Sequence, residues 1–359
     1  MLGKMFRVSL LGESHGKAVG VLIEGCPPGL KMSEEDIDEM LALRSPGSIR
    51  FTSRRREPDK AEIMSGVFKG YTTGAPILIL IYNKDVDSSP YEKMRFKPRP
   101  GHADYTAYVK YRGFNDYRGG GMFSGRLTAG LVAAGAVAKK ILSLEGIEVY
   151  AYLREVGGVK STVRNVEELK KAYESPFYCP DLDAVEKFRE VLVDAAWAGD
   201  SVGGVVEGVA VNVPVGLGEP PIDTLEGDLA KALFAIPAAK GVEFGSGFKL
   251  AEMRGSEAND EYVVRNGRIV TLTNNSGGIL GGISNGMPIV VRVAFKPTPS
   301  ISRRQRTVDL RTMEETWIRV EGRHDVCIAI RAVPVVDAVM SIVLADHLLR
   351  WYAWTGIRY

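Results

Sequence analysis

Cysteine, long apolar runs and net charge are the features that this sequence has little of. Its 359 residues include three cysteines, Cys26, Cys179 and Cys327, and no C-x-x-C pair. Without such pairs we expect no disulfide framework or zinc site, and a reducing compartment is favoured. The apolar run at 75–82 is too short to cross a bilayer, and residues 1–25 show no signal-peptide pattern. We therefore expect a soluble, cytoplasmic protein with no membrane partner.

The net charge is close to zero. Lys and Arg number 46 against 44 for Asp and Glu, which leaves a formal charge of +2. A charge this small gives no general attraction to nucleic acid or membranes, so any anion site must be local. No low-complexity linker divides the chain. We therefore expect residues 1–359 to fold as a single domain.

Local patterns predict a mixed α+β fold. Short β-branched runs between glycine turns predict strands at 6–11, 19–24, 77–82, 205–213, 289–295 and 327–333. Helical periodicity predicts helices at 33–43, 127–144 and 335–351, and Ser33 followed by Asp36 is close to a capping box. Strands with interspersed helices and no regular βαβ alternation favour α+β over a doubly wound sheet.

A weak repeat relates the two halves of the chain. Residues 12–16 (GESHG) and 199–203 (GDSVG) lie 187 positions apart, and each precedes a predicted strand and a Pro-x-Gly-Leu turn. In a chain with 40 glycines such a match can arise by chance, and internal duplication is the other explanation. If the repeat is real, the glycine and serine frame is architectural. His15, which is replaced by Val202 in the second copy, is then the non-structural part.

The segment 12–16 also fits the G-x-S-x-G pattern of a serine-hydrolase nucleophile elbow. Such an elbow needs a helix directly after the serine, whereas the residues that follow favour a strand. Asp325 and His347 would complete a triad only loosely. A serine hydrolase that uses Ser14 is therefore the less favoured alternative.

Histidine is scarce, with four in the chain, and three lie in loops. His15, His102 and His324 are surrounded by glycine, proline and charged residues, whereas His347 lies in a predicted helix, where a packed or surface role is expected. Loop histidines placed by glycine turns are typical of general acids and bases. A metal site is disfavoured because no H-E-x-x-H or H-x-H spacing occurs.

Two segments have the features of anion sites. Residues 44–60 carry five arginines and Lys60, and guanidinium groups bind phosphate or carboxylate through two parallel hydrogen bonds. A solvated charged loop is the alternative. Residues 119–121 are three glycines before a predicted helix, with Ser124 as a candidate cap or donor. The alternative there is a sharp turn that only glycine permits.

Two later segments complete the set of candidates. Residues 273–301 are rich in glycine, which lets the backbone approach a flat ligand closely. Arg323, His324 and Asp325 precede the predicted strand at 327–333. An arginine beside Asp325 would keep the carboxylate ionised as a base, or would simply close the end of a strand as an ion pair.

Together these segments resemble the chorismate synthase family. The similar motifs run nearly end to end and include FRVSLLGESHG, GCPPG, RREPD, RPGHADY, DYRGGG, GDSVGG, NNSGGILGGISNG, FKPTPSI and GRHDVCIAIRAVP. The resemblance implies a β-α-β sandwich with internal pseudo-duplication, assembled as a homotetramer. It also implies the anti-1,4-elimination of phosphate and the C6 pro-R hydrogen from 5-enolpyruvylshikimate 3-phosphate. The product is chorismate, in aromatic amino-acid biosynthesis, and reduced FMN is required although the net reaction is redox-neutral.

The resemblance further implies roles for single residues. His102 would protonate the N1 region of the flavin, and His15, supported by Ser14, would protonate the departing phosphate. Asp325 would assist proton removal from C6 through flavin N5, and Ser124 would help to hold that network. Flavin contacts are implied for Met122, Phe123, Ser124, Pro237, Ala238, Gly281, Lys296, Pro297, Thr298, Pro299, Ser300 and Arg323.

Arginines match the family's anion-binding positions. Arg44 and Arg50 match positions associated with nicotinamide-nucleotide or substrate-phosphate binding, and Arg126 is implied as a substrate contact. The family commonly has Arg-Ser where this chain has Met122-Phe123, and Asn-Ala or Gln-Ala where it has Pro237-Ala238. Backbone contacts would survive both changes, whereas side-chain contacts at these positions need not.

The resemblance to the family also bears on where reduced FMN comes from and on which other class of protein this could be. We see no long insertion that would house a flavin reductase, so a separate reductase is expected, with NADPH as an indirect reductant. A non-catalytic flavin- or anion-binding protein is the alternative from another class. It would keep the arginines and glycine loops but would not need His15, His102 and Asp325.

Overall fold

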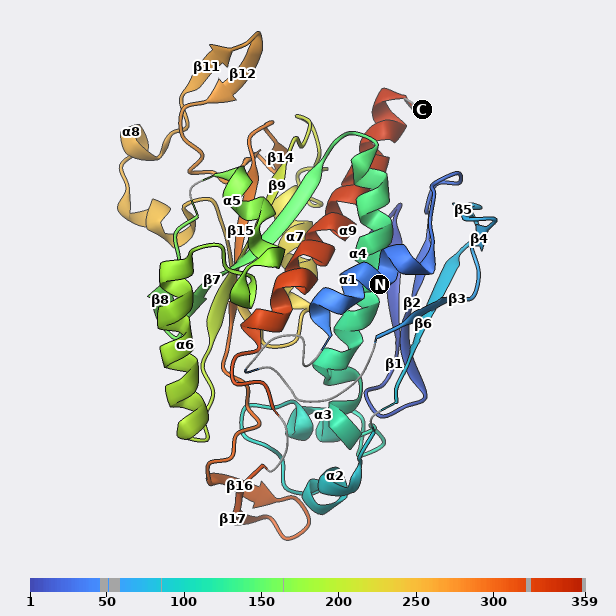
Figure 1. Cartoon of the computed structure of the whole chain (residues 1–359), viewed down its shortest axis with the longest axis vertical. Coiled ribbons are helices and arrows are strands. Elements are labelled where there is room, and N and C mark those ends of the chain that lie inside the picture. Colours follow the sequence, from blue (N-terminus) through green and yellow to red (C-terminus); the bar gives the residue numbers. More distant parts are fainter. Residues whose placement is uncertain (46–50, 52–58, 85, 164, 321–323, 357–359) are drawn as a thin grey trace.

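In the computed structural model, two antiparallel sheets lie on either side of a layer of helices (Figure 1). The structure describes residues 1–359 apart from 46–50, 52–58, 85, 164, 321–323 and 357–359. One sheet has the order β1 (Arg7–Gly12), β2 (Ala18–Glu24), β6 (Ile77–Tyr82), β3 (Ala61–Ile63). The other has the order β10 (Ala239–Phe244), β15 (Ile289–Phe295), β9 (Gly204–Val211), β7 (Glu148–Val156), β8 (Val159–Lys160).

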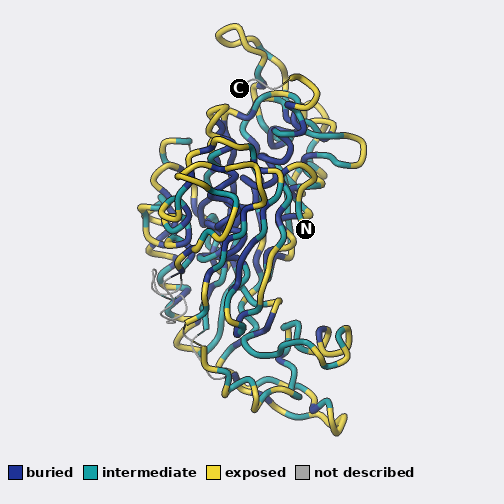
Figure 2. Tube along the Cα trace, turned by 90° about the vertical axis from the view of Figure 1, so that its right-hand side faces the viewer, coloured by how far each residue is buried: buried dark blue, intermediate teal, exposed yellow. Residues whose placement is uncertain are grey.

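Four helices form the layer between the sheets: α1 (Glu34–Arg44), α4 (Thr128–Ser143), α7 (Leu225–Phe234) and α9 (Ala329–Thr355). Helix α4 packs on the first sheet, α9 packs on the second, and the two helices pack against each other. One hydrophobic cluster contains residues of both sheets and of all four helices. Figure 2 shows these buried stretches gathered along the centre of the molecule.

The remaining elements lie around this sandwich. The helices among them are α2 (Ser89–Met94), α3 (Asp104–Lys110), α5 (Val166–Lys170), α6 (Leu182–Trp197) and α8 (Gly255–Ala258), with 3-10 turns η1 (Arg118–Phe123), η2 (Gly125–Leu127), η3 (Ala172–Glu174), η4 (Pro176–Tyr178) and η5 (Gly247–Glu252). The two-stranded ribbons are β4 (Val67–Phe68) with β5 (Tyr71–Thr72), β11 (Tyr262–Arg265) with β12 (Arg268–Thr271), β13 (Ile279–Leu280) with β14 (Ile283–Ser284), and β16 (Gln305–Asp309) with β17 (Glu314–Ile318).

Most predicted elements are confirmed. The strands at 77–82 and 289–295 have the predicted bounds, and those at 6–11, 19–24 and 205–213 differ by one or two residues. The capping box of α1 is present, since Asp36 N–H donates to Ser33 Oγ (3.4 Å) and Ser33 N–H donates to Asp36 Oδ2 (2.9 Å). The mixture of helix and strand agrees with the predicted α+β class.

The strand predicted at 327–333 is wrong. Helix α9 begins at Ala329 and continues through Pro334. The β-branched residues there favour a strand by propensity, but the segment is packed between α4, α7 and the second sheet, and tertiary burial outweighs that preference. The same packing explains the composition of α9, which is long and apolar enough to span a membrane. Its most apolar window is 94% buried inside the protein, as expected of a core helix.

The two sheets share one topology. Along the chain, β1, β2, α1, β3, β6 and α4 are followed by β7, β9, α7, β10, β15 and α9. The spatial orders β1-β2-β6-β3 and β7-β9-β15-β10 correspond strand by strand. In each half, the helix after the second strand packs against the helix after the last strand, α1 on α4 and α7 on α9.

A turn after β2 is closed by one threonine. Thr72 Oγ1 accepts from the N–H of Leu30 (2.9 Å) and donates to the carbonyl of Pro27 (2.7 Å). The Thr72 backbone adds two bonds, from Gly29 N–H to its carbonyl (2.8 Å) and from its own N–H to the Leu30 carbonyl (2.9 Å). Gly29 has φ +86°, a conformation that glycine adopts without strain.

The turn after β9 repeats this arrangement 187 positions later. Ser284 Oγ accepts from the N–H of Leu217 (2.9 Å) and donates to the carbonyl of Pro214 (2.6 Å). The Ser284 carbonyl accepts from the N–H of Gly216 (3.0 Å), and the Ser284 N–H donates to the carbonyl of Leu217 (2.8 Å). Gly216 also has a positive φ, +114°. The sequence repeat therefore coincides with four equivalent hydrogen bonds in each half.

Candidate active site

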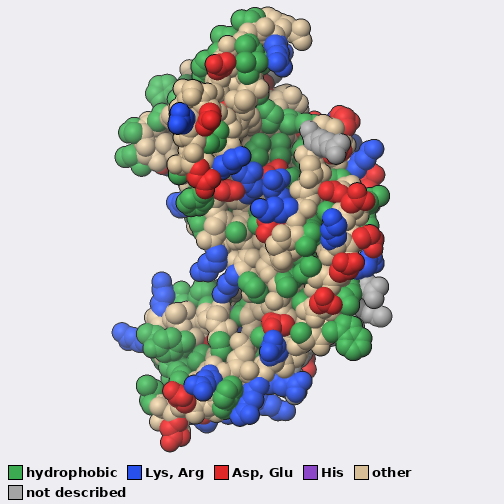
Figure 3. Space-filling model, turned by 90° about the vertical axis from the view of Figure 1, so that its left-hand side faces the viewer, with side chains coloured by type: hydrophobic (Ala, Val, Ile, Leu, Met, Phe, Trp, Pro, Cys, Tyr) green, Lys and Arg blue, Asp and Glu red, His purple; other side chains and the backbone are tan. Residues whose placement is uncertain are grey.

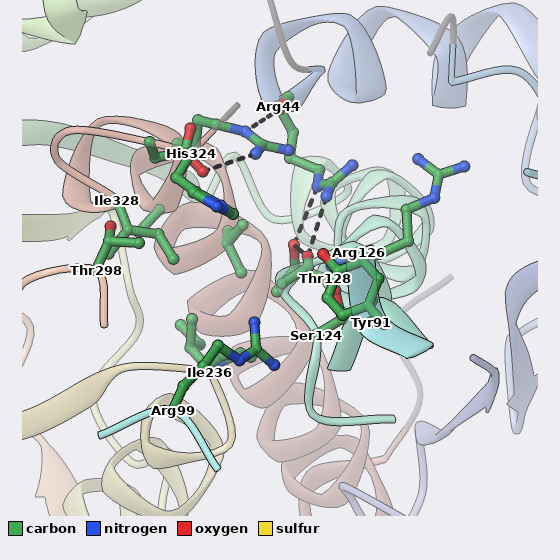
Figure 4. A pocket seen from close by; sticks show the side chains of 17 residues that line it. Arg44, Tyr91, Arg99, Ser124, Arg126, Thr128, Ile236, Thr298, His324 and Ile328 are labelled. Atoms are coloured by element: carbon green, nitrogen blue, oxygen red, sulfur yellow. Dashed lines mark hydrogen bonds and ion pairs between the residues drawn. The ribbon is translucent and has the colours of Figure 1, made fainter. Parts of the chain in front are cut away.

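A pocket lies where the N-terminal ends of α4 and α9 meet the C-terminal ends of α1 and α7. Figure 4 shows Arg44, Arg99 and Arg126 approaching it from three different elements. The lining residues are Arg44, Tyr91, Arg99, Gly119, Ser124, Gly125, Arg126, Thr128, Ile236, Pro237, Thr298, His324, Asp325, Ile328, Arg331, Ala332 and Val335. A lining of apolar side chains with several arginines is that of a site for a small organic anion.

Two predicted histidines flank the triple glycine beside this pocket. A Cβ at Gly119 would collide with the His15 ring and lie 2.8 Å from Ser14 Oγ, and one at Gly120 would lie 3.4 Å from His102 Nε2. Gly119 and Gly120 have φ of +60° and +85°. Glycine is therefore required twice over, by conformation and by space, and the segment brings His15 and His102 to one wall.

His15 and Ser14 are both buried. The His15 Nδ1 atom lies 2.9 Å from Ser88 Oγ, and the ring meets Tyr91 edge-on at 5.2 Å between centroids. Among the described residues, the Ser14 hydroxyl has no hydrogen-bond partner. The element that follows is the strand β2, so the helix of a nucleophile elbow is not present after Ser14.

His102 belongs to a charged cluster at the start of α3. Its Nδ1 atom lies 2.6 Å from Asp104 Oδ1, and Arg99 holds the same carboxylate through Nε and Nη2, both at 2.8 Å. Burial alone would raise the pKa of Asp104, but hydrogen bonds from Arg99 and His102 outweigh it and hold the pKa below its usual range. Arg99 Nη1 also donates to Ser300 Oγ (3.1 Å).

Arg44 and Arg126 share one carboxylate behind the pocket wall. Asp59, whose side chain is fully buried, accepts from Arg44 Nη1 at 2.7 Å and from Arg126 Nη1. Burial lowers the pKa of Arg44 to about 10, helped by the nearby charge of Arg331. Burial would raise the pKa of Asp59, but the charges of Arg44 and Arg126 outweigh this and lower it. Two guanidinium groups against one carboxylate leave this wall positively charged.

Asp325 is paired with Arg331, and the Arg323 considered in the sequence lies outside the described residues. The Asp325 Oδ2 atom lies 3.2 Å from Nη1 of Arg331 in the first turn of α9, and Arg331 Nε also donates to the Arg44 carbonyl (3.3 Å). The substrate-phosphate candidate Arg50 also lies outside the described residues. Ser124 lines the pocket, and its Oγ accepts from Arg126 N–H (3.3 Å), so it caps η2 rather than α4.

The predicted flavin contacts are only partly gathered at the pocket. Pro237 and Thr298 line it, with Lys296, Pro297, Pro299 and Ser300 in the same segment after β15. Ala238 accepts at its carbonyl from Lys296 N–H (3.0 Å). Met122 and Phe123 are 47% and 36% exposed and contact Tyr111. Gly281 lies in the β13–β14 turn beside the first turn of α7, whereas Pro237 follows the last turn of that helix.

The pocket lining fits a flat apolar ring that carries anionic groups. The apolar part of the lining, which we call the apolar wall, consists of Ile236, Pro237, Ile328, Ala332 and Val335. Among the described residues, the buried Thr298 hydroxyl has no hydrogen-bond partner within the protein. An orphaned buried hydroxyl on a pocket wall is expected where a ligand supplies the partner. Reduced FMN therefore fits the residues present.

Comparison with known proteins agrees with this geometry. The family model for chorismate synthase matches residues 6–349. The chain belongs to the chorismate synthase family. It is 58% identical over 358 residues to the chorismate synthase of Thermococcus gammatolerans, covering 99% of both chains, and 57% identical to that of Aeropyrum pernix, covering 97% of this chain and 92% of the relative. A solved structure titled "Crystal Structure of Chorismate Synthase" superposes with a TM-score of 0.76 at 33% identity, covering 97% of this chain and 93% of that one.

Family membership establishes the reaction. The protein is a carbon–oxygen lyase that eliminates phosphate and the C6 pro-R hydrogen from 5-enolpyruvylshikimate 3-phosphate in a 1,4-anti sense. The product is chorismate, a precursor in aromatic amino-acid biosynthesis by the shikimate pathway. Chorismate synthases use reduced flavin for this step, although the overall reaction changes no oxidation state.

Sequence reasoning missed three residues of this chorismate synthase pocket. Arg99 precedes His102 by three positions, and the clustering of the two in one short motif was the available signal. Arg331 reaches the pocket only because residues 329–334 are helical, so the wrong strand prediction concealed it. Tyr91 contacts both Arg99 and His15, and no local pattern in the sequence predicts either contact.

Positive charge is local on this nearly neutral enzyme. In Figure 3, Lys and Arg side chains gather at the waist and around the lower end of one face. The lower end carries β16 and β17, where Arg304 and Arg306 stack over Trp317, and Arg311 stacks over Phe96. A net charge of +2 is therefore compatible with local gatherings of Lys and Arg side chains on the surface.

Proposed function

We propose that the arginine-lined pocket is the site of the elimination, with His15 and His102 as its proton-handling groups. His15 donates a proton to the departing phosphate, and Ser14 supports it from the same wall. His102 holds a proton at the N1 region of the flavin. Asp325 assists removal of the C6 hydrogen, and Ser124 helps to hold that network. The observation that carries the proposal is the packing of His15 against Gly119, which lines the pocket, and of His102 against the neighbouring Gly120.

The arginines are proposed to bind the anionic groups of the substrate. The substrate carries a phosphate and two carboxylates, and bidentate guanidinium contacts suit both groups. Arg44 and Arg126 supply two guanidinium groups to the pocket lining, and both pair with Asp59. Arg50 is proposed as a further phosphate or nicotinamide-nucleotide contact from the segment that the structure leaves undescribed.

The apolar wall is proposed to hold reduced FMN. Pro237, Ala238 and the segment 296–300 would contact the flavin, together with Ser124 and with Arg323 from outside the described residues. Contacts at Met122, Phe123 and Gly281 are proposed on family resemblance alone, because these residues do not line the pocket. When bound, reduced FMN supplies electron density that assists loss of phosphate from the allylic carbon.

An anaerobic assay with reduced FMN and 5-enolpyruvylshikimate 3-phosphate tests these roles. Following chorismate absorbance and phosphate release, we expect His15→Ala and His102→Ala each to lower kcat by about 10²–10⁴-fold, the usual size of a general acid–base contribution. His347→Gln is the control, because His347 lies about 27 Å along α9 from its pocket end. It should keep full turnover when folded.

Two results would reject the proposed roles. If both pocket histidines can be replaced with full activity, neither handles a proton that matters to turnover. Labelling of Ser14 by a fluorophosphonate would instead favour the hydrolase alternative. A non-catalytic binding protein would bind FMN with the same affinity in all variants and release no phosphate.

We propose that reduced FMN comes from a separate flavin reductase, with NADPH as the indirect reductant. The family model and the curated relatives match almost the whole chain, which leaves little room for an added reductase unit. The purified chain with oxidised FMN and NADPH should then consume no NADPH under anaerobic conditions. Adding a flavin reductase should start chorismate formation, whereas NADPH oxidation by the chain alone would contradict the proposal.

We propose an internal pseudo-duplication within one domain. The matching strand orders, the paired helices and the equivalent bonds of Thr72 and Ser284 support the duplication. The single hydrophobic cluster shared by both halves supports one domain. A cytoplasmic homotetramer is proposed from the family, and exposed apolar residues on the β11–β12 ribbon, such as Val264 and Ile269, suit a buried interface. Light scattering distinguishes four chains from one.

A further inference from the structure

His102 lies in a hydrogen-bonded cluster with Asp104 and Arg99. Asp104, the first residue of α3, places Oδ1 2.6 Å from His102 Nδ1. Arg99 fixes that carboxylate from the other side with Nε and Nη2, and its backbone N–H donates to Oδ2 as well (3.0 Å). A carboxylate held by three donors of one residue has little freedom to turn away from the imidazole.

This geometry decides which ring nitrogen of His102 carries the proton. An ionised carboxylate only accepts hydrogen bonds, so Nδ1 must be the donor to Asp104. Arg99 and His102 hold the pKa of Asp104 below its usual range, against the effect of burial, so the carboxylate stays ionised at neutral pH. In the neutral ring, Nε2 then keeps its lone pair. Arg99 Nη2 lies at nearly equal distances from Nδ1 (3.2 Å) and Nε2 (3.3 Å), so the Asp104 contact is what distinguishes the two ring nitrogens.

The remaining nitrogen, Nε2, lies on the edge of the ring that faces the triple glycine 119–121. A Cβ at Gly120 would lie 3.4 Å from His102 Nε2 and 3.8 Å from the Cβ of Ser124, so this edge of the ring lies against the triple glycine. The nearby Lys296 ammonium donates to the carbonyl of Gly101. The charges that face the imidazole are therefore those of Arg99 and Asp104.

The chain contains a second histidine–aspartate pair with the opposite arrangement. His347 contacts Asp228 through Nε2, at 3.0 Å, in the core beside Arg350. The same rule places the proton of that ring on Nε2. The two pairs thus form a matched set within one protein, one at the pocket and one remote from it.

We propose that Asp104 is a positioning residue for His102, which holds the ring proton on Nδ1 and leaves Nε2 as the nitrogen that exchanges a proton at the pocket wall. This inference rests on the proposed role of His102 in proton handling. Arg99 completes the arrangement because it orients the carboxylate. A purely structural Asp104 would serve only to close the loop onto α3 through Arg99, without any effect on the imidazole.

Replacing Asp104 by asparagine separates these two roles. In Asp104→Asn the donors of Arg99 still require an acceptor, so the amide oxygen turns toward Arg99 and the amide NH2 group faces His102. Nδ1 must then accept, which moves the ring proton to Nε2. The loop closure through Arg99 survives the substitution, whereas the proton position reverses.

Nitrogen-15 magic-angle-spinning NMR of the full-length protein, labelled at histidine, measures the proton position directly. The four histidines give few signals, and His102→Gln assigns the one that matters. At a pH where the ring is neutral, we expect protonated Nδ1 for His102 in wild type and protonated Nε2 in Asp104→Asn. Asp228→Asn is the matched control: it should alter the His347 signals and leave those of His102 unchanged.

Kinetics supply the second readout. We expect Asp104→Asn to lower kcat by at least about 100-fold, with a smaller change in KM, and to cause no additional loss in the His102→Ala background. A His102 ring protonated at Nε2 in wild type would overturn the proposal, even if the asparagine variant does not fold. An unchanged ring in a folded Asp104→Asn protein would overturn it too. If His102→Ala alone keeps full activity, the proposed function of His102 fails, while the NMR result still decides what Asp104 does.

Discussion

At the scale of the residue, the pocket depends on one buried carboxylate shared by two arginines. Asp59 is fully buried and neutralises only one of the two charges that Arg44 and Arg126 bring. Arg44 has further partners in Thr128 Oγ1 (3.0 Å) and the Gly125 carbonyl (3.0 Å). A guanidinium that is buried and fully oriented before the ligand arrives loses little entropy when it binds an anion.

Gly119 gives the sharpest prediction at this scale. In Gly119→Ala the new Cβ would lie 2.5 Å from His15 Nε2, so the histidine must move. We expect kcat to fall by about 100-fold or more, because proton transfer depends on sub-ångström placement. Gly70→Ala is the matched control, since Gly70 has φ +79° but no atom within 4 Å of its Cβ position. Both variants carry the strain of a positive φ, about 1–2 kcal/mol in unfolding free energy, but only the first should lose turnover. Equal kcat in the two variants would contradict the placement of His15.

At the scale of the element, the contact between α4 and α9 holds the two halves together. Gly135 of α4 lies against Ala338 of α9, and a Cβ at position 135 would lie 2.6 Å from the Ala338 Cα. Glycine costs a helix up to about 1 kcal/mol relative to alanine. Its presence in a helix interior therefore indicates that close approach of the two helices is worth more than helix propensity.

The corresponding prediction is a loss of stability in Gly135→Ala. Alanine gains about 1 kcal/mol of helix propensity, but the clash with α9 costs about 1–3 kcal/mol or more, so the net unfolding free energy should fall. Urea unfolding monitored by circular dichroism measures it. Gly255→Ala, where the added Cβ meets no atom within 4 Å, should be neutral or slightly stabilising. A more stable Gly135→Ala protein would show that the helices are not in close contact.

At the scale of the whole molecule, the two sheets of the enzyme have corresponding strand orders. The turns closed by Thr72 and Ser284 make equivalent bonds, and the helices that follow the two sheets meet along the centre. The ends of all four central helices converge on the pocket, which therefore takes residues from both halves. The first half supplies His15 and His102 beside the pocket, and the second half supplies His324 to its lining.

The repeated turns predict equal and independent losses of stability. Thr72→Ala and Ser284→Ala each remove two side-chain hydrogen bonds of a buried hydroxyl, which should cost about 1–3 kcal/mol of unfolding free energy each. The double variant should lose the sum, because the sites share no partner. Thr72→Ser, which keeps the hydroxyl, is the control and should lose clearly less. Strongly unequal losses would contradict equivalent roles for the two turns.

The sequence by itself determined the local elements and the chemical inventory of this protein. Alternating apolar runs and a capping box placed the strands and α1, because such signals act between neighbours in the chain. Motif resemblance identified the family, and the repeat at 187 positions indicated two related halves. Tertiary structure decided what depends on contacts between distant segments. Burial made residues 329–333 helical and so brought Arg331 to Asp325, and the packing of η1 set His15 and His102 on one wall. The position of the proton on the His102 ring likewise depends on Arg99 and Asp104. The distances and directions of these hydrogen bonds are properties of the folded chain that no local sequence pattern contains.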